Sequence, residues 1–304
     1  MVDNGLILVT GAAGQVGSVG RTLTHLLLER RFQVRAMVRR EDERAASLRA
    51  AGAQVVVGNL LEPGDVYRAV SGCSRVYFSM SVNAAYLEAA LTMTAVAREA
   101  GVSAFVNMSQ MTVSEMSIQK TTPSHQQRQH WLSEQALAWS GLPVVFIRPT
   151  MFQESFFQLA APSVRARDRI ELPFGRGKTS PVAATDVAQV VAAVLADPVP
   201  HLGKIYDLTG PQSQDMDGIA REFSEALNRE VTYSDVNPEE WEQNLKKVGM
   251  PEHLTGHLAT IGWLHRTGRY DRQTDGVQRM TGHPAMSVRE FVSLHADEFG
   301  GRRS

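Results

Sequence analysis

Short apolar runs alternate with longer segments of helical periodicity through the first half of the chain. Six of the runs have the length and continuous apolar character of strands buried on both faces. They are Leu6–Val9, Gln33–Val38, Gln54–Val57, Arg75–Phe78, Ala104–Met108 and Pro143–Arg148. The helical segments between them are Gln15–Arg30, Glu43–Ala51, Asp65–Val70, Ala84–Ala100 and Ser124–Ser140. This alternation predicts a parallel sheet with helices on both faces.

The pattern changes after Pro149. The stretch 151–181 is expected to be irregular, because prolines and glycines gather near its end. Asp186–Ala196 has helical spacing and Ile205–Leu208 is strand-like, and both are expected to return to the main sheet. From Gly210 onward, short helices are expected to dominate.

Together these elements predict an α/β fold: a Rossmann-type, doubly wound parallel sheet with a small, mostly helical C-terminal substrate cap. The dinucleotide-binding domain is predicted to comprise residues 1–150, with 180–210 returning to its sheet. The cap is predicted to comprise 151–179 and 211–304.

A glycine-rich segment joins the first predicted strand to the first predicted helix. It reads Thr10-Gly11-Ala12-Ala13-Gly14-Gln15-Val16-Gly17. Gly11 permits a tight turn, Gly14 lets the backbone approach a pyrophosphate, and Gly17 lets the helix pack closely on the strand. The amides at the start of the helix then face the negative phosphates. The segment predicts a dinucleotide site, and a glycine-rich turn without a ligand is the alternative.

The Gly-x-x-Gly-x-x-Gly spacing resembles that of the extended and atypical short-chain dehydrogenases/reductases, with a small insertion that includes Gly20. Further motifs narrow the resemblance to the NmrA-like atypical reductases. They are Val34–Arg39, Gly58–Leu60, Ser109, Ile147–Glu154, Ala184–Ala188 and Thr281–Pro284. The resemblance covers nearly the whole chain. It implies either a reductase of quinones, azo dyes or aromatic ethers, or a regulator that senses the cofactor.

The end of the second strand decides between the two nicotinamide cofactors. Arg39 and Arg40 stand where the adenosine ribose is expected, and a guanidinium suits a 2′-phosphate by charge and geometry. We therefore expect NADP(H) to be preferred, with NAD(H) possible. Glu41 and Asp42 follow one position later, and the two arginines are alternatively solvated surface charges.

The resemblance places further residues along the cofactor. Asn59 and Leu60 follow the third strand, where the family meets the adenine. Ser79 and Met80 end the fourth strand, which implies contact with the pyrophosphate and the nicotinamide-side ribose. Each of these is alternatively a strand-end residue without a ligand.

The catalytic signature departs from the superfamily, because no tyrosine is followed by a lysine four residues later. The expected helix offers His125 and His130 instead, with Glu134 one turn beyond His130. Three interpretations compete. In the first, one of these histidines donates the proton while Ser109 polarises the carbonyl. In the second, the protein mainly positions the hydride and water supplies the proton. In the third, there is no catalysis, and His130 and Glu134 form an ordinary surface pair.

Methionine and aromatic side chains are expected around the substrate, because ligands of open α/β folds bind beyond the carboxyl ends of the strands. The residues chosen on this basis are Met111, Met151, Phe152, Phe156 and Trp263. Core packing is the alternative for each. With the resemblance, they predict an aromatic or quinone-like substrate.

Composition narrows the partners. The 304 residues carry a formal net charge of −1, which favours neither nucleic acid nor a membrane surface. A single cysteine, Cys73, excludes an intrachain disulfide and fits a cytoplasmic protein without a signal peptide. No metal-ligand spacing is present in the sequence, and a monomer or homodimer is expected.

The leading hypothesis is an NADPH-dependent reductase of an aromatic carbonyl, quinone or hydroquinone tautomer. The abundance of alanine, glycine and arginine hints at a GC-rich genome, which suggests a polycyclic aromatic natural-product intermediate as the substrate. The alternative is a non-enzymatic NADP(H) sensor that binds a protein partner. A sugar-nucleotide epimerase is weaker, because no basic cluster is placed for its substrate.

Overall fold

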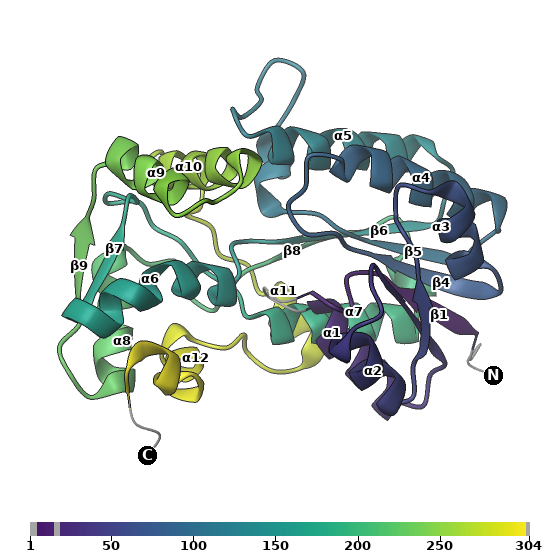
Figure 1. Cartoon of the computed structure of the whole chain (residues 1–304), viewed down its shortest axis with the longest axis horizontal. Helices are drawn as coiled ribbons and strands as arrows, with labels where there is room; N and C mark the ends of the chain where they lie inside the picture. Colours follow the sequence, from purple (N-terminus) through teal and green to yellow (C-terminus); the bar gives the residue numbers. More distant parts are fainter. Residues whose placement is uncertain (1–4, 15–18, 302–304) are drawn as a thin grey trace.

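A computed structural model describes residues 5–14 and 19–301 of the chain. Seven parallel strands form the main sheet in the order β3-β2-β1-β4-β5-β6-β8 (Figure 1). They are β1 (Leu6–Val9), β2 (Val34–Val38), β3 (Gln54–Val57), β4 (Cys73–Phe78), β5 (Ala104–Met108), β6 (Val144–Pro149) and β8 (Ile205–Leu208). The predicted doubly wound sheet is confirmed, including the return of β8 beside β6.

Helices cover both faces of this sheet. One face carries α1 (Val19–Glu29), α2 (Glu43–Ala50) and α7 (Ala184–Ala196), and the other α3 (Pro63–Val70), α4 (Tyr86–Glu99) and α5 (His125–Trp139). The residues of strand β1 are all apolar because helices cover both faces of the strand. Ile7 and Val9 lie in the apolar cluster under α1 and α7, whereas Leu8 lies in the cluster under α3 and α4. All three side chains are fully buried.

Local capping fixes the ends of several helices. Ser287 and Glu290 form a capping box at the start of α12 (Val288–Leu294). At the start of α5, the Ser124 hydroxyl accepts a hydrogen bond from the amide of Gln127. The reciprocal hydrogen bond of a capping box is missing there, because the buried side chain of Gln127 makes no hydrogen bond within the described part of the chain.

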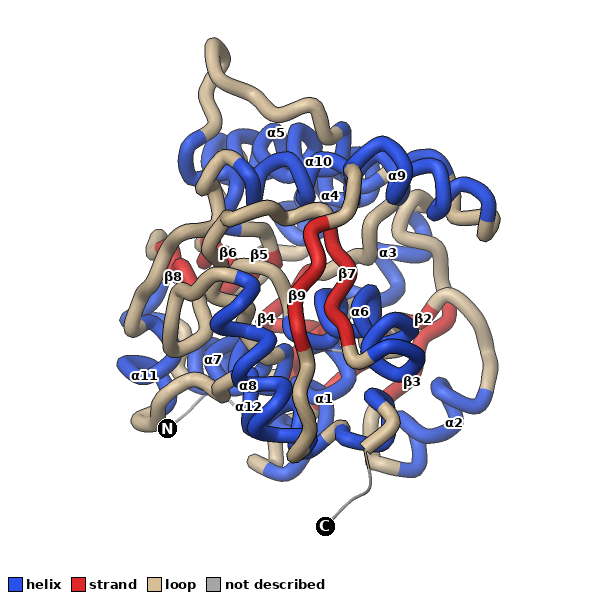
Figure 2. The backbone as a smooth tube through the Cα atoms, turned by 90° about the vertical axis from the view of Figure 1, so that its left-hand side faces the viewer, coloured by secondary structure: helices blue, strands red, loops and turns tan. Residues whose placement is uncertain are grey.

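The second half of the chain forms a smaller body beside the sheet. Its elements are α6 (Gln153–Arg167), β7 (Arg169–Leu172), α8 (Met216–Leu227), β9 (Thr232–Asp235), α9 (Pro238–Lys247), α10 (Glu252–Arg266) and α12, whereas α11 (Gly276–Thr281) packs under the main sheet on α7. Strands β7 and β9 pair in parallel as a separate two-stranded sheet (Figure 2). The domain boundaries drawn from the sequence stay a prediction.

The expectation that 151–181 is irregular is wrong, because this stretch contains α6 and β7. Phe156, Phe157, Ala160 and Val164 recur at helical spacing, and all four are buried in the apolar cluster of the smaller body. The helix tolerates Pro162 within it. The prolines and glycines that suggested irregular structure all lie beyond β7.

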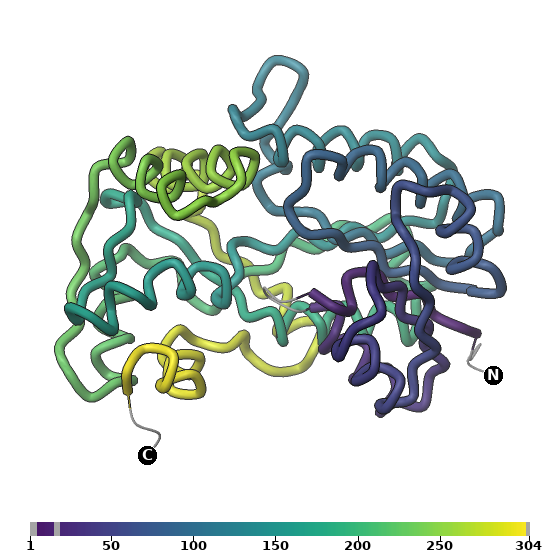
Figure 3. Tube along the Cα trace, viewed as in Figure 1, coloured from purple at the N-terminus to yellow at the C-terminus, as the bar shows by residue number. Residues whose placement is uncertain are grey.

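The smaller body is attached at the carboxyl ends of the strands. The trace in Figure 3 runs from β6 directly into α6. Helix α10 returns to lie against α5, which Figures 1 and 2 both show. Helices α6 and α10, which are far apart in the sequence, thereby enclose the space above the ends of β4, β5 and β6.

Candidate cofactor and substrate site

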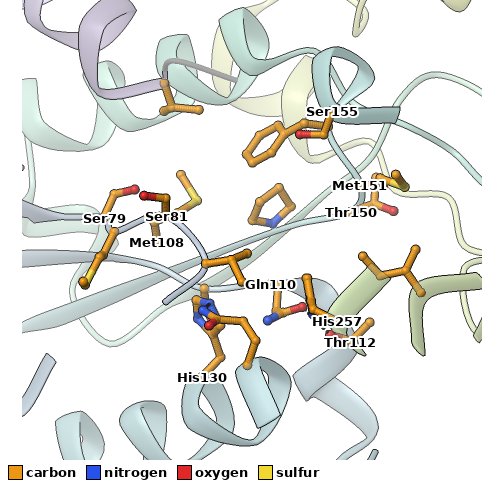
Figure 4. A pocket seen from close by; sticks show the side chains of 18 of the residues that line it. Ser79, Ser81, Met108, Gln110, Thr112, His130, Thr150, Met151, Ser155 and His257 are labelled. Atoms are coloured by element: carbon orange, nitrogen blue, oxygen red, sulfur yellow. Dashed lines mark hydrogen bonds between the residues drawn. The ribbon is translucent and has the colours of Figure 1, made fainter. Parts of the chain in front are cut away.

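A cavity of about 540 Å³ lies between the carboxyl ends of the main strands and helix α10. The glycine turn forms one end of it through Gly11, Gly14, Val19, Gly20, Ser79 and Met80. Residues that follow β5 and β6, together with α5, α6 and α10, form the rest (Figure 4). The exposed lining is mostly apolar, which suits a flat organic ligand.

The turn after β1 brings backbone very close to the first helix. Gly11 has φ of +69°, a conformation that favours glycine. A Cβ built on Gly20 would lie 2.8 Å from the carbonyl carbon of Gly11 and 2.9 Å from the carbonyl oxygen of Thr10. Gly20 therefore allows the close approach of α1 to the turn, a role that the sequence did not predict for it. Gln15, Val16 and Gly17 lie outside the described residues, and α1 is described from Val19 rather than from Gln15.

Two strand ends are tied together beside this turn. The Thr10 hydroxyl donates to the carbonyl of Ser79 and accepts from the Ser79 amide, both at 2.8 Å. A Cβ on Gly11 would lie 3.2 Å from that same carbonyl oxygen. Thr10 thus has a structural role, and it holds Ser79 and Met80 at the edge of the cavity.

Two arginines donate hydrogen bonds to the backbone of the turn, a role that was not predicted from the sequence. Arg44 Nη1 donates to the carbonyl of Ala13, and Arg21 Nη2 donates to the carbonyl of Gly14, both at 2.9 Å. Both guanidinium groups place positive charge next to a turn whose amides would face phosphates. Arg21 lies on α1, the helix that follows the glycine motif, and Arg44 lies in the first turn of α2, after β2. A basic residue on α1 is a signal that could have indicated Arg21, whereas Arg44 depends on long-range packing.

Arg39 and Arg40 are exposed, and neither forms a hydrogen bond or ion pair with the residues described. The nearby acids are occupied: Glu41 pairs with Arg49, while Asp42 caps α2 and pairs with Arg44. Those pairings hold the pKa of both carboxyl groups below their usual values, chiefly through the hydrogen bonds to the arginines. Neither acid is therefore free to compete with an anion at Arg39 or Arg40.

Asn59 and Leu60 lie away from the cavity. The Asn59 side-chain oxygen accepts from the amide of Leu61 at 3.2 Å, as in a local turn, and Asp65 accepts from the Asn59 amide. Leu60 packs against the apolar cluster under α3 and α4. Their predicted contact with the adenine stays a prediction.

The turn fits a nicotinamide dinucleotide. The backbone of the turn comes so close to α1 that there is no room for a Cβ on Gly20. Arg44 and Arg21 donate hydrogen bonds to two carbonyl groups of the turn. Arg39 and Arg40, at the end of β2, have no partner among the described residues. Gly11, Gly14, Gly20, Ser79 and Met80 line the cavity at this end, and the predicted contacts of these residues with the cofactor stay a prediction.

Ser109, which directly follows β5, and His130, on α5, both line the cavity, and Figure 4 shows His130 there. The Ser109 hydroxyl and the Nδ1 atom of His130 are buried and have no hydrogen-bond partner among the described residues. The hydroxyl of Thr150, which also lines the cavity, is buried and unpartnered as well. Several polar groups without a partner around one cavity indicate a ligand site.

The hydrogen bonds of Gln126 fix which nitrogen of His130 carries the proton. The Gln126 side-chain oxygen accepts from the Asn83 amide at 3.1 Å, so its nitrogen is the atom 3.1 Å from His130 Nε2. That nitrogen can only donate, so Nε2 accepts and the proton lies on Nδ1. Burial lowers the pKa of His130 to about 3, with a smaller effect from His257. At neutral pH, His130 is a neutral hydrogen-bond donor.

The other predicted features of α5 lie elsewhere. His125 is exposed and lines a separate groove with residues of α4, away from Ser109. Glu134 does not pair with His130 on the surface; it forms a buried ion pair with Arg148 of β6, whose Nε donates to Glu134 at 2.9 Å. The surface-pair interpretation of His130 and Glu134 is therefore wrong, because this face of α5 packs on the sheet.

The predicted substrate residues divide into two groups. Met111, Met151 and Phe152 line the cavity. Phe156 is fully buried, with its ring 4.9 Å from that of Phe157, in the core of the smaller body. Trp263 is 51% exposed and points away from the cavity. These last two positions are corrections: one side of α6 and one side of α10 face the cavity, and neither residue is on it.

Helix α10 supplies a cavity face that the sequence analysis missed. Leu254, His257, Leu258 and Ile261 recur at helical spacing and line the cavity, and Met250 precedes them. His257 stands among these apolar residues, and its Nδ1 lies 2.9 Å from the Ser124 hydroxyl. A histidine within an apolar helical stripe is the signal that could have indicated a ligand-facing group.

Among residues 5–14 and 19–301, no group of three or more His, Cys, Asp or Glu side chains is arranged to hold a metal ion. The same residues form no helix of the length and apolar character needed to cross a membrane. Cys73 is buried, which raises the pKa of its thiol to about 11.

The parallel sheet, the glycine turn at its switch point and the adjoining cavity define the class: an NAD(P)H-dependent oxidoreductase of Rossmann fold. A family model described as NAD(P)H-binding matches residues 11–198. The chain belongs to this family, and the NmrA-like, atypical short-chain reductase resemblance is confirmed.

Particular relatives support the assignment. An NAD(P)H azoreductase from Xenophilus azovorans is 30% identical over 297 residues, which cover 97% of this chain and 99% of the relative. The fold is that of an NADPH-dependent quinone oxidoreductase from Escherichia coli, solved with NADPH, with a TM-score of 0.83, 24% identity and coverage of 95% and 99%. It is also that of NmrA, a negative transcriptional regulator solved with NADP, with a TM-score of 0.79, 18% identity and coverage of 97% of each chain.

Proposed function

We propose that this protein is an NADPH-dependent reductase of an aromatic carbonyl, quinone or hydroquinone tautomer. The observation that carries the proposal is the pair of buried, unpartnered polar groups on Ser109 and His130, two residues that line an apolar cavity next to the cofactor turn. A carbonyl oxygen between them would satisfy both groups. The relatives named as azoreductase and quinone oxidoreductase support the same class of substrate.

NADPH, when bound along the glycine turn, supplies a hydride at the nicotinamide end of the cavity. The residues of this chain position the acceptor and stabilise the charge that develops on its oxygen. Ser109 Oγ and His130 Nδ1 each donate a hydrogen bond to that oxygen, in a site with few competing water molecules. Because the neutral imidazole has lost its easily removed proton, His130 acts as a polarising donor and not as an imidazolium acid.

This proposal combines two interpretations of the predicted catalytic helix: a histidine acting with Ser109, and hydride positioning with water as the source of the proton. Ser109 and His130 polarise the carbonyl, and water delivers the proton after hydride transfer. A quinone suits such a site, because a reduced quinone oxygen needs less acid assistance than the alkoxide of a ketone. The chain therefore manages without the Tyr-x-x-x-Lys pair.

Arg39 and Arg40 support the preference for NADPH over NADH, with NADH a possible second cofactor. Both are exposed at the end of β2 and free of partners in the described chain, as a site for a 2′-phosphate requires. Arg44, held on the Ala13 carbonyl, adds charge to the same region.

Absorbance at 340 nm tests the proposal. The purified protein is mixed with NADPH and a panel of quinones, azo dyes and polycyclic aromatic ketones, and NADH is run in parallel. Substrate-dependent oxidation that is faster with NADPH than with NADH supports a reductase and identifies the ring system. Loss of absorbance at the same rate with and without substrate contradicts it.

The second candidate is a sensor that binds NADP(H) and passes the redox state to a protein partner. The missing Tyr-x-x-x-Lys pair and the likeness in fold to NmrA favour it. Tight NADPH binding without oxidation across the panel would favour the sensor. Retention of the protein's own partner on immobilised protein only in the presence of NADP⁺ or NADPH would then establish it.

For the reductase, we further propose a cytoplasmic location, a monomer or homodimer and a polycyclic aromatic natural-product intermediate as substrate. The near-neutral charge and the buried thiol of Cys73 support the cytoplasmic location. The apolar cavity supports the polycyclic aromatic substrate. Light scattering tests the oligomeric state, and polycyclic members of the panel test the substrate.

A further inference from the structure

The start of helix α5 and the middle of α10 are joined by one hydrogen bond. Ser124 Oγ lies 2.9 Å from His257 Nδ1, and the same oxygen accepts the Gln127 amide at 3.2 Å as the cap of α5. His257 lines the substrate cavity together with apolar residues of its own helix. The hydrogen bond to Ser124 fixes the orientation of the His257 ring, which lies between Leu254 and Leu258 on its helix.

This bond also determines which ring nitrogen faces the ligand. As a cap, the Ser124 oxygen already accepts one hydrogen bond, and its own proton has no acceptor in the described chain other than His257 Nδ1. Donation to Nδ1 places the imidazole proton on Nε2, on the other side of the ring. Burial lowers the pKa of His257 to about 4, so the ring is neutral at working pH.

His257 lines the cavity, and its Nε2 atom makes no hydrogen bond to the residues described. It therefore opens onto the cavity as a hydrogen-bond donor. Ser109 and His130 approach the cavity from β5 and α5, whereas His257 approaches from α10. The cavity thus holds two separate histidines, His130 on α5 and His257 on α10, and Figure 4 shows both.

We propose that His257 binds a second acceptor atom of the substrate, distant from the carbonyl that Ser109 and His130 hold. This inference rests on the proposed reductase function and specifies its substrate: an aromatic compound with acceptors on two sides, such as a 1,4-dicarbonyl. A buried donor left without a partner penalises a ligand that lacks the second acceptor. His257 is on this basis a specificity-determining residue that contacts substrate.

The test compares His257→Leu, His257→Gln and the wild type with two substrates, 1,4-naphthoquinone and the single-carbonyl ketone 1-tetralone. We expect His257→Leu to raise KM for the quinone about tenfold, the loss of one hydrogen bond to a desolvated site, with a smaller change in kcat. KM for the ketone should stay unchanged. His257→Gln should recover most of the quinone KM, because its amide nitrogen can donate. Equal effects on the two substrates, or no recovery in His257→Gln, would overturn the inference.

His253→Leu is the matched control, because His253 is exposed on the same helix, one turn from His257. Calorimetric binding of 1,4-naphthoquinone to the NADP⁺-bound protein separates this inference from the reductase proposal, since no hydride is available there. Binding weakened only by His257→Leu, in a protein that never oxidises NADPH, would keep the inference and remove the reductase. If the protein oxidises NADPH and His257→Leu binds the quinone as tightly as the wild type, the reductase proposal stands and the inference on His257 is overturned.

Discussion

Gly20 stands against Gly11 so closely that a Cβ on Gly20 would lie 2.8 Å from the carbonyl carbon of Gly11. We expect Gly20→Ala to push α1 away from β1, at a cost of about 1–3 kcal/mol in the free energy of unfolding, as overpacking does. NADPH binding should weaken as well, because the turn moves with the helix. Urea unfolding and fluorescence titration with NADPH measure the two effects.

Gly64→Ala is the control for this prediction. Gly64 lies in helix α3, and a Cβ built there meets nothing within 4 Å. Its replacement should leave unfolding and NADPH binding unchanged, or add slightly to stability. If Gly20→Ala behaves like Gly64→Ala, the close approach of α1 to β1 does not constrain this turn.

Ser109 and His130 should both matter to turnover and neither to cofactor binding. Ser109→Ala and His130→Ala are each expected to lower kcat about 100-fold, the usual effect of removing one oxyanion donor, while the dissociation constant of NADPH stays constant. His125→Ala, on the exposed side of the same helix, is the control. Unchanged steady-state turnover in both variants would show that the donors of this site lie elsewhere.

Arg39 should discriminate between the two cofactors. Arg39→Ala is expected to weaken NADPH binding about tenfold or more and leave NADH binding unchanged, because a charge-assisted hydrogen bond to the 2′-phosphate is lost. Equilibrium titration with each cofactor gives the ratio. An equal loss for both cofactors would point to a general electrostatic role for Arg39.

The buried histidines should make the protein less stable in acid. Burial lowers the pKa of His130 and His265 to about 3 and that of His257 to about 4, against about 6.5 in the unfolded chain. The unfolded state therefore binds more protons between pH 6.5 and 4, so stability is full above pH 6.5 and falls as the pH is lowered. The loss is on the order of 1 kcal/mol per pH unit for each histidine.

Urea unfolding at pH 7.5, 6.0 and 5.0 measures this dependence. His265→Phe should flatten it, because the ring of His265 is stacked on Phe174 and Tyr270 and a phenyl ring can keep that stack. A profile as steep in His265→Phe as in the wild type would mean that His265 titrates near its ordinary pKa in the folded protein.

The buried ion pair between Glu134 and Arg148 gives a further prediction. Arg148→Met leaves the Glu134 carboxylate buried without its partner, which should cost about 3–5 kcal/mol of stability. The double variant Glu134→Leu/Arg148→Met should recover most of this loss, because both charges are then gone. Thermal unfolding of the three proteins decides, and a double variant as unstable as Arg148→Met would contradict the argument.

The main sheet could be predicted from the sequence because both of its faces are covered. Each strand such as Leu6–Val9 is then a continuous apolar run, and each helix between strands keeps an apolar stripe. Ser109 could be placed for the same reason, since it directly follows the buried strand β5. The close packing of Gly20 on the turn was not predicted, and the role predicted for Gly17 lies outside the described residues.

The parts that were missed depend on long-range packing. Whether Phe156 or Trp263 faces a ligand depends on which side of α6 or α10 turns toward the sheet, and local periodicity does not specify that. The tautomer of His130 follows from Asn83, which lies 43 residues before Gln126. His257 gains its fixed orientation from a cap residue 133 positions earlier in the chain.

Helix α10 contributes cavity-lining side chains but none of the residues that grip the glycine turn. Changes at positions such as Leu254 or Leu258 can therefore reshape the ligand space while leaving the cofactor end untouched. A lineage could acquire a new substrate by drift in this one helix and retain its source of reducing power throughout. The same separation makes α10 the segment to randomise when a reductase for a chosen aromatic compound is sought.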